Sequence, residues 1–111
     1  MTIAVLYRWR VDPAKGRQFE NAWAEGTRLI HEHCGSYGAR RHKAKDGLYW
    51  SYALWPDEDS RRRCFRETDI MTHNSFERMR AAIIESFEEI HLEPCVDVLD
   101  ALPGAKSGGG R

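Results

Sequence analysis

Aromatic side chains that carry a polar atom are concentrated in two short segments of this 111-residue chain. Tyr and Trp rings bury a large apolar area and still offer a hydroxyl or an indole N–H as a hydrogen-bond donor. Such rings can line a pocket for a flat aromatic ligand, or they can fill a small core and a dimer interface. Six of the eight Tyr and Trp residues belong to these segments: Tyr7, Trp9, Tyr49, Trp50, Tyr52 and Trp55.

Other residue types give little support to metal, nucleotide or nucleophile chemistry. The sequence has no Gly-rich phosphate loop, no carboxylate–histidine metal set and no nucleophile elbow. His31 and His33 are two residues apart on a predicted helix, so their side chains diverge by about 200° and cannot jointly hold a metal. His91, at a predicted helix C-terminus, is explained by the favourable charge it carries there. We therefore expect neither a metal site nor a cofactor.

The three cysteines are an odd number, and no Cys-x-x-Cys pair is present. Cys34, Cys64 and Cys95 are spaced about thirty residues apart. This pattern favours reduced, half-buried packing residues over a disulfide framework or a zinc site.

The charge balance and the length limit the class of protein. Seventeen Lys and Arg residues against 17 Asp and Glu residues give a formal net charge of zero, which removes the long-range field that attracts nucleic acid or an anionic membrane. No apolar run approaches the roughly 20 residues of a membrane helix, and Met1 leads into an alternating segment without a targeting signal. We expect one cytoplasmic domain over residues 1–102 and a flexible tail over residues 103–111.

The first third of the chain predicts a strand and a long helix. Residues 3–11 alternate with the period of a strand, and Tyr7 and Trp9 lie on its more apolar face. Asp12 and Pro13 suit a helix start, and Gly35 suits a helix end. Apolar side chains between them recur at three- and four-residue steps, which predicts one amphipathic helix.

The middle of the chain predicts a hairpin followed by a second helix. Asp46-Gly47 is the strongest turn signal present, and it joins a strand over residues 37–45 to an antiparallel strand over residues 48–55. Pro56-Asp57 opens a helix that continues to about Glu67. The basic run of residues 61–63 is interpreted as the solvated face of this helix.

The last third predicts a second long helix and a final strand. Asn74 with Glu77 three residues later resembles a capping box. Apolar side chains behind it recur at steps of three and four, which predicts a helix from Ser75 to about His91. Pro94 ends this helix, and residues 95–102 are short enough for a strand.

This element order predicts an α+β fold, the ferredoxin-like βαββαβ arrangement with an extra helical segment. Its four-stranded antiparallel sheet carries the helices on one face. The strand over residues 48–55 is apolar or aromatic on both sides, so the other face also needs cover. We expect a homodimer that joins sheet to sheet through Trp50, Tyr52 and Leu54.

The segment Ser51-Tyr52-Ala53-Leu54-Trp55-Pro56-Asp57 follows the Asp-Gly turn, and Phe19 and Trp23 precede both on the first helix. With the element order, it resembles the antibiotic biosynthesis monooxygenase (ABM) domain family over roughly residues 2–101. The resemblance implies a dimeric α+β barrel with a pocket between the sheet and the helices of each subunit. Members of the family include cofactor-free oxygenases of polycyclic aromatic polyketides, haem-degrading enzymes and proteins with no known substrate.

The family's functional residues are transferred position by position. In the cofactor-free oxygenases the third strand holds an Asn and, four residues on, a Trp; here Ser51 and Trp55 stand at these positions. The haem-degrading branch has an Asn on strand one and a helical Trp; this chain lacks that Asn and has Cys64 near the Trp position, which leaves only His73 as a counterpart. The resemblance therefore implies a small cofactor-independent monooxygenase acting on an aromatic or polyketide-like substrate. The alternative is a non-catalytic dimeric ligand-binding or interaction module of the same fold.

Such an oxygenase lets the substrate anion supply electrons to oxygen, while the site excludes water, takes up a proton and holds the anion. Ser51, Trp55 and a Tyr hydroxyl are the candidate donors to that anion, and His73 or His42 is the candidate proton acceptor. The catalytic candidates are thus Trp55, Ser51 and His73, and the candidate substrate-binding residues are Tyr7, Trp9, Tyr49, Phe65 and Phe76.

Overall fold

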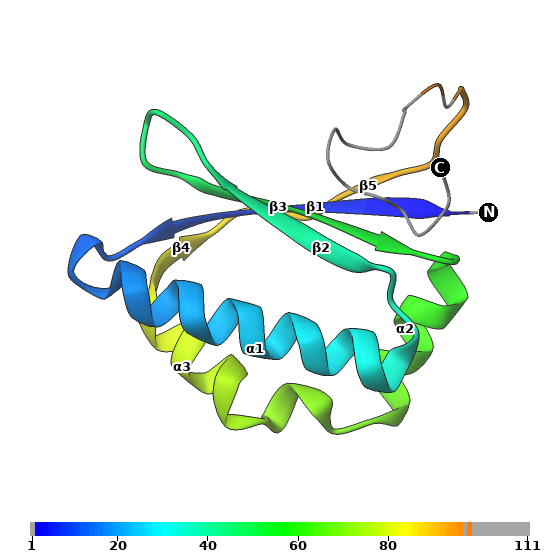
Figure 1. The fold of residues 1–111 in the computed structure, drawn as a ribbon, viewed down its shortest axis with the longest axis horizontal. Coiled ribbons are helices and arrows are strands. Elements are labelled where there is room, and N and C mark those ends of the chain that lie inside the picture. The colour runs from blue at the N-terminus through cyan, green and yellow to red at the C-terminus, as the bar shows by residue number, and fades with distance from the viewer. Residues whose placement is uncertain (1, 97, 99–111) are drawn as a thin grey trace, which may run out of the picture.

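The computed structural model describes residues 2–96 and 98, and it shows one sheet with helices on one side (Figure 1). The elements confirm the predicted α+β, ferredoxin-like fold class. In chain order they are β1 (Ile3–Val11), the 3-10 turn η1 (Pro13–Lys15), α1 (Gly16–Cys34), β2 (Gly38–Lys43), β3 (Tyr49–Trp55), α2 (Glu58–Glu67), the 3-10 turn η2 (Ile70–Thr72), α3 (Asn74–Ala82), β4 (Ile83–Ser86) and β5 (Ile90–Leu92).

The sheet is antiparallel and has the strand order β2-β3-β1-β4, with β5 also paired to β1. β3 covers one edge of β1 along nearly its whole length, from Ile3 opposite Trp55 to Trp9 opposite Tyr49. β4 and β5 share the other edge of β1, with residues 87–89 between them. Helices α1 and α3 pack side by side beneath the sheet, and α2 lies near the C-terminal end of α1 (Figure 1).

The local signals in the sequence place the element ends as predicted. Asp12 accepts a hydrogen bond at 2.9 Å from the Ala14 N–H before α1, and Gly35 ends that helix in the left-handed region at φ 76°. Gly47 has φ 89° in the β2–β3 turn, a conformation that favours glycine. Asp57 caps α2 by accepting the Ser60 N–H at 2.7 Å.

The prediction of one helix from Ser75 to His91 is wrong. α3 ends at Ala82, and residues 83–86 and 90–92 are strands instead. Continuing the helix would leave the backbone groups along the second edge of β1 without partners, whereas the two strands pair with them. The helix cap also differs, because His73 Nδ1 rather than Asn74 accepts the Ser75 N–H, at 3.0 Å.

The predicted final strand over residues 95–102 falls mostly outside the described residues. Residues 95, 96 and 98 are described and belong to no strand. The rest of that segment and the predicted tail over residues 103–111 lie outside the described part, so the division at residue 102 stays a prediction.

The two faces of β3 have the character expected from its alternation. Tyr49, Ser51, Ala53 and Trp55 face the helices and are buried. Tyr52 on the opposite face is 41% exposed. The core has two buried clusters on the helix side, one around Phe19 and one around Trp55. Any space for a ligand between the sheet and the helices depends on the side chains that lie between these clusters.

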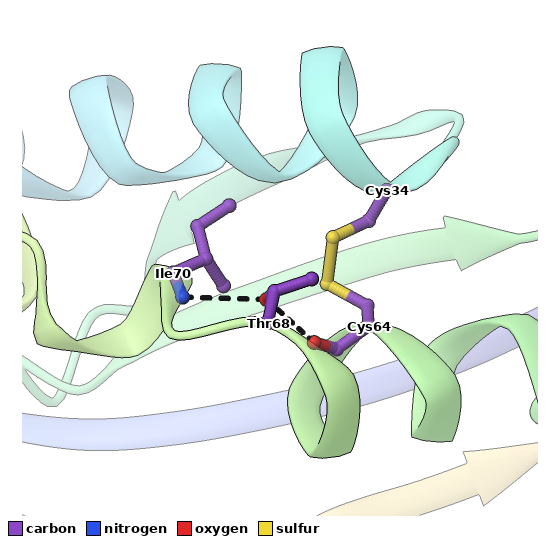
Figure 2. Close-up of a disulfide and its surroundings, with 4 residues drawn as sticks. All are labelled: Cys34, Cys64, Thr68 and Ile70. Atoms are coloured by element: carbon purple, nitrogen blue, oxygen red, sulfur yellow. Dashed lines mark hydrogen bonds between the residues drawn. A yellow bond between two sulfur atoms is a disulfide. The ribbon is translucent and has the colours of Figure 1, made fainter.

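The prediction that the cysteines are reduced is wrong for two of them. Cys34, at the end of α1, forms a disulfide with Cys64 of α2, and their Cα atoms are 5.4 Å apart (Figure 2). The Thr68 hydroxyl donates to the Cys64 carbonyl at 2.7 Å and accepts the Ile70 N–H at 3.3 Å, which fixes the chain after α2. The fold brings together two cysteines whose spacing gave no sign of pairing, while Cys95 is free and exposed.

Candidate functional site

A cavity of about 360 Å³ lies between the helix-side face of the sheet and the helices. Pockets for small ligands have volumes of about 300–1,000 Å³ and mostly apolar linings. This lining is mostly aromatic and aliphatic, with a few polar groups. The lining residues are Tyr7, Trp9, Trp23, Thr27, Ile30, Ser36, Ala39, Ser51, Ala53, Trp55, Arg61, Phe65, Met71, Phe76, Met79 and Glu89.

Six of the eight residues that the sequence predicted for a site line this cavity. They are Trp55, Ser51, Tyr7, Trp9, Phe65 and Phe76, and they come from β1, β3, α2 and α3. The Trp55 and Phe65 rings meet edge to face at 5.8 Å between centroids, and the Tyr7 and Trp9 rings stack at 5.7 Å. The structure therefore gathers these side chains around one space, and their individual roles stay predictions.

The other two predicted residues lie elsewhere. The Tyr49 hydroxyl donates to Glu20 at 3.2 Å and its ring packs on Phe19, next to the cavity rather than in its wall. Burial, with the Glu20 hydrogen bond, raises the pKa of Tyr49. His73 is exposed and caps α3 outside the cavity lining, so its position gives the predicted proton-acceptor role no support. His42 is no substitute, because it is exposed and pairs with Trp50 on the opposite face of the sheet.

Arg61 is the main polar residue of the cavity, and the sequence interpretation misplaced it. It is 8% exposed, which corrects the prediction that residues 61–63 form a solvated face; only Arg62 and Arg63 are exposed. Its Nη2 donates to the Tyr7 hydroxyl at 3.0 Å and to Glu89 Oε1 at 2.7 Å. Its Nη1 reaches Glu58 Oε2 at 3.4 Å.

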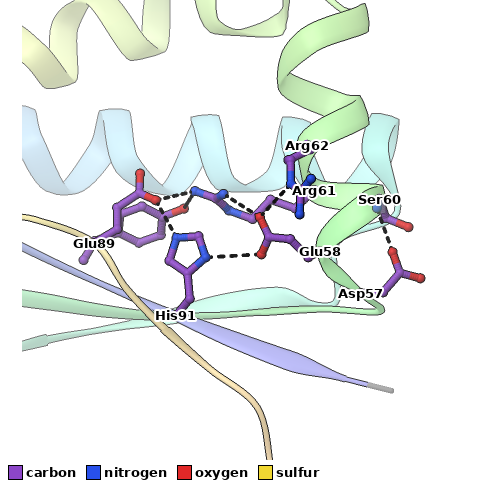
Figure 3. A network of polar contacts seen from close by, with 8 residues as sticks. Asp57, Glu58, Ser60, Arg61, Arg62, Glu89 and His91 are labelled. Carbon is purple, nitrogen blue, oxygen red and sulfur yellow. Dashed lines mark hydrogen bonds and ion pairs between the residues drawn. The ribbon is translucent and has the colours of Figure 1, made fainter.

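His91 completes this polar cluster from β5 (Figure 3). Its Nδ1 lies 3.2 Å from Glu58 Oε1, and its Nε2 lies 3.0 Å from Glu89 Oε1. The sequence placed His91 at a helix end, which is wrong because the segment is a strand. Glu89 lies between β4 and β5, and it both lines the cavity and contacts His91.

The cluster holds its phenol and its guanidinium in defined protonation states. Burial raises the pKa of Tyr7, although the Arg61 hydrogen bond and charge act in the opposite direction, so the phenol stays neutral and can donate. Burial alone would lower the pKa of Arg61, but the Tyr7 hydrogen bond and the nearby Glu89 and Glu58 charges raise it overall. Tyr7 and Arg61 therefore act as donors at physiological pH.

One sequence signal could have found part of this cluster. Arg61 is three and four residues before Cys64 and Phe65, so it shares the helix face that both of them turn inward. Glu89 and His91 had no comparable signal, because their positions depend on a strand where the periodicity predicts a helix.

Two features were not found among the described residues. Within residues 2–96 and 98, no group of three or more His, Cys, Asp or Glu residues is arranged to hold a metal ion. No helix in this part of the chain is long and apolar enough to cross a membrane. The cytoplasmic location and the absence of a cofactor stay predictions.

Comparisons with known proteins agree with the fold. The family model described as Antibiotic biosynthesis monooxygenase matches residues 2–83. The cofactor-independent oxygenase SnoaB from Streptomyces nogalater is similar with a TM-score of 0.70 and 19% identity over 89% of this chain and 98% of its own. Rv0793 from Mycobacterium tuberculosis is similar with a TM-score of 0.65 and 10% identity over 89% of this chain and 100% of its own. At these identities the structures show the shared fold alone, and no curated protein matches the sequence.

Proposed function

The chain belongs to the antibiotic biosynthesis monooxygenase family, and on that basis we propose that it is a cofactor-independent monooxygenase of an aromatic, polyketide-like substrate. One observation carries the proposal. The space beside Trp55 is open, and Tyr7, Arg61 and Glu89 face it, whereas a protein that kept only the fold could fill it with Trp9, Phe65 or Phe76. The likeness to the SnoaB fold supports the same proposal.

The reaction needs few groups from the protein, because the substrate anion itself supplies the electrons. A substrate methylene reacts with O₂, one oxygen atom becomes the new carbonyl oxygen and the other leaves in water, so all electrons come from the two C–H bonds. The aromatic walls exclude bulk water and strengthen each hydrogen bond to the anion. Ser51 and the Trp55 indole N–H are the proposed donors on β3.

Replacing Trp55 with Phe tests this proposal. The change keeps an aromatic ring but removes the indole donor, so we expect kcat for the active substrate to fall about tenfold. Oxygen uptake with a panel of anthrones and hydroxyquinones measures it. Tyr37→Phe is the control, because Tyr37 is 58% exposed and lies outside the cavity lining.

Two outcomes would count against the proposal in different ways. An unchanged rate in Trp55→Phe removes Trp55 from the mechanism. Binding of panel members without oxygen uptake by the native protein instead favours the alternative, a non-catalytic module that binds a small ligand in the same cavity.

We also propose that the outer face of the sheet joins two copies of this chain. Tyr52, Ile90 and Leu92 are 41%, 37% and 45% exposed on this face, and Trp50 and Leu54 lie beside Tyr52 on β3. Apolar side chains gathered on an exposed face are typical of an interaction surface. A second copy would present the same surface, as a two-fold dimer requires.

Tyr52→Arg is expected to convert the dimer into a monomer at micromolar concentration, because it buries one unpaired charge from each subunit at the interface. Analytical ultracentrifugation measures the mass. Tyr37→Arg is the control, since Tyr37 precedes β2 and is 58% exposed. A monomeric native protein, or a variant that remains a dimer, would contradict the proposed interface.

A further inference from the structure

We propose that Tyr7 and Arg61 bind an ionisable hydroxyl of the ligand as its oxyanion, and that Glu89 and His91 take the proton it releases. The inference rests on the proposed function and names both the recognised group and the residues that recognise it. It selects aromatic ligands with an acidic phenol or enol over ligands of the same shape without one.

The Tyr7 hydroxyl is the hydrogen-bond donor to the ligand oxygen. Its hydroxyl oxygen accepts a hydrogen bond from Arg61 Nη2 at 3.0 Å, which leaves the hydroxyl hydrogen free to point elsewhere. Tyr7 lines the cavity, so a ligand oxygen there can accept that hydrogen. A hydroxyl that accepts from a cation is polarised and becomes a stronger donor, most of all toward an anion.

The Arg61 side chain is held in place within the site. Its side chain is 9% exposed, and both terminal nitrogens have carboxylate partners. Its guanidinium carbon also lies 5.3 Å from the centre of the Phe65 ring. These contacts hold the guanidinium beside the Tyr7 hydroxyl before a ligand binds.

The charges show why the cluster needs a proton acceptor as well as a donor pair. Arg61 carries one positive charge and meets two carboxylates, Glu58 and Glu89. A ligand that arrived already ionised would add a third negative charge to this group. A ligand that arrives neutral and releases its proton within the cluster leaves the total charge unchanged.

His91 is placed to receive that proton. One of its ring nitrogens lies 3.0 Å from Glu89 and the other lies 3.2 Å from Glu58, so an imidazolium can donate to both carboxylates. Glu89 lines the cavity, while the His91 side chain is 43% exposed and can pass the proton on to water. The ligand O–H bond breaks, the proton moves through the Glu89 carboxylate to His91, and the oxyanion stays beside Tyr7.

The position of Glu89 depends on the break in the sheet edge. Between β4 and β5 the chain leaves the strand pairing, although the Phe87 N–H still donates to the Arg8 carbonyl at 3.1 Å. The charged and titratable groups that face this point are Tyr7 from β1, Glu58, Arg61 and Arg62 from α2, and Glu89 and His91 from the β4–β5 segment.

The experiment uses 2-hydroxyanthraquinone, whose visible band shifts to longer wavelength when its phenol ionises. Titrated without oxygen in the presence of saturating native protein, the bound probe should show a pKa about one unit below its value in buffer. Tyr7→Phe should abolish most of this shift, and His91→Gln should reduce it. Arg61→Lys should retain part of the pKa shift, because lysine keeps the positive charge. It should lose the rest, because lysine lacks the planar set of guanidinium N–H donors.

Two controls separate recognition from general damage. Tyr37→Phe makes the same change at an exposed tyrosine and should leave the shift intact. Native protein should bind 2-methoxyanthraquinone about tenfold more weakly than the hydroxyl probe, and this comparison needs no variant to fold. His91→Gln alters a half-exposed side chain and should remain folded.

The inference is overturned if the native protein binds both probes equally, if the bound probe keeps its buffer pKa, or if Tyr7→Phe retains the full shift. A shifted pKa without oxygen uptake from any anthrone supports the inference and counts against the proposed function. Oxygen uptake together with an unshifted probe pKa supports the proposed function and counts against the inference.

Discussion

Replacing Cys34 and Cys64 together with serine is expected to lower the free energy of unfolding by about 3 kcal/mol. The disulfide closes a loop with a sequence separation of 30 residues, which restricts the unfolded chain. It also ties α2 to the end of α1, and α2 carries Arg61 and Phe65 into the cavity wall. The loss should therefore weaken binding of the hydroxyanthraquinone probe as well as stability.

Urea unfolding followed by circular dichroism measures this effect. Cys95→Ser is the matched control, since Cys95 is free and exposed, and it should change stability little. A reducing agent should destabilise the native protein and the Cys95→Ser variant, but it should leave the double variant unchanged. Equal stability of the native and double-variant proteins would show that this disulfide does not hold α2 in place.

Replacing Phe19 with Ala is expected to lower the free energy of unfolding by about 4 kcal/mol. Phe19 is fully buried on α1, and its ring packs against Trp9 at 5.4 Å and Tyr49 at 4.9 Å between centroids. Removing it leaves a void between two rigid rings that belong to different strands. Because Trp9 also lines the cavity, the change should loosen that wall.

Phe87→Ala is the matched control for this prediction. It deletes the same ring from a partly exposed position, where Phe87 packs over Arg8, and it should cost clearly less stability. Thermal and urea unfolding give both values. A similar loss for the two variants would mean that the Phe19 cluster is not the main support of this end of the sheet.

The sequence was most informative where the chain's local chemistry and the final fold agree. The alternation of residues 49–55 predicted which side chains of β3 turn inward, and the structure confirms that face. Turn and cap residues such as Gly35, Gly47 and Asp57 lie where predicted, because a positive φ or an unpaired N–H depends on a few neighbouring residues.

Prediction from the sequence failed where pairing with a distant segment outweighed the local pattern. Residues 76–90 have apolar side chains at helical steps, yet the chain turns into strands at Ile83 because one edge of β1 needs backbone partners. The same long-range pairing brings Glu89 and His91 to Arg61, more than two dozen residues earlier in the chain.

The sequence by itself determined strands β1 to β3, helices α1 and α2 and the aromatic walls of the cavity, because alternation, helical periodicity and turn chemistry are properties of short segments. The tertiary structure alone decided the Cys34–Cys64 pairing, the burial of Arg61 and the polar cluster at the break between β4 and β5. These features join side chains from separate elements, and their positions exist only after the helices have packed on the sheet.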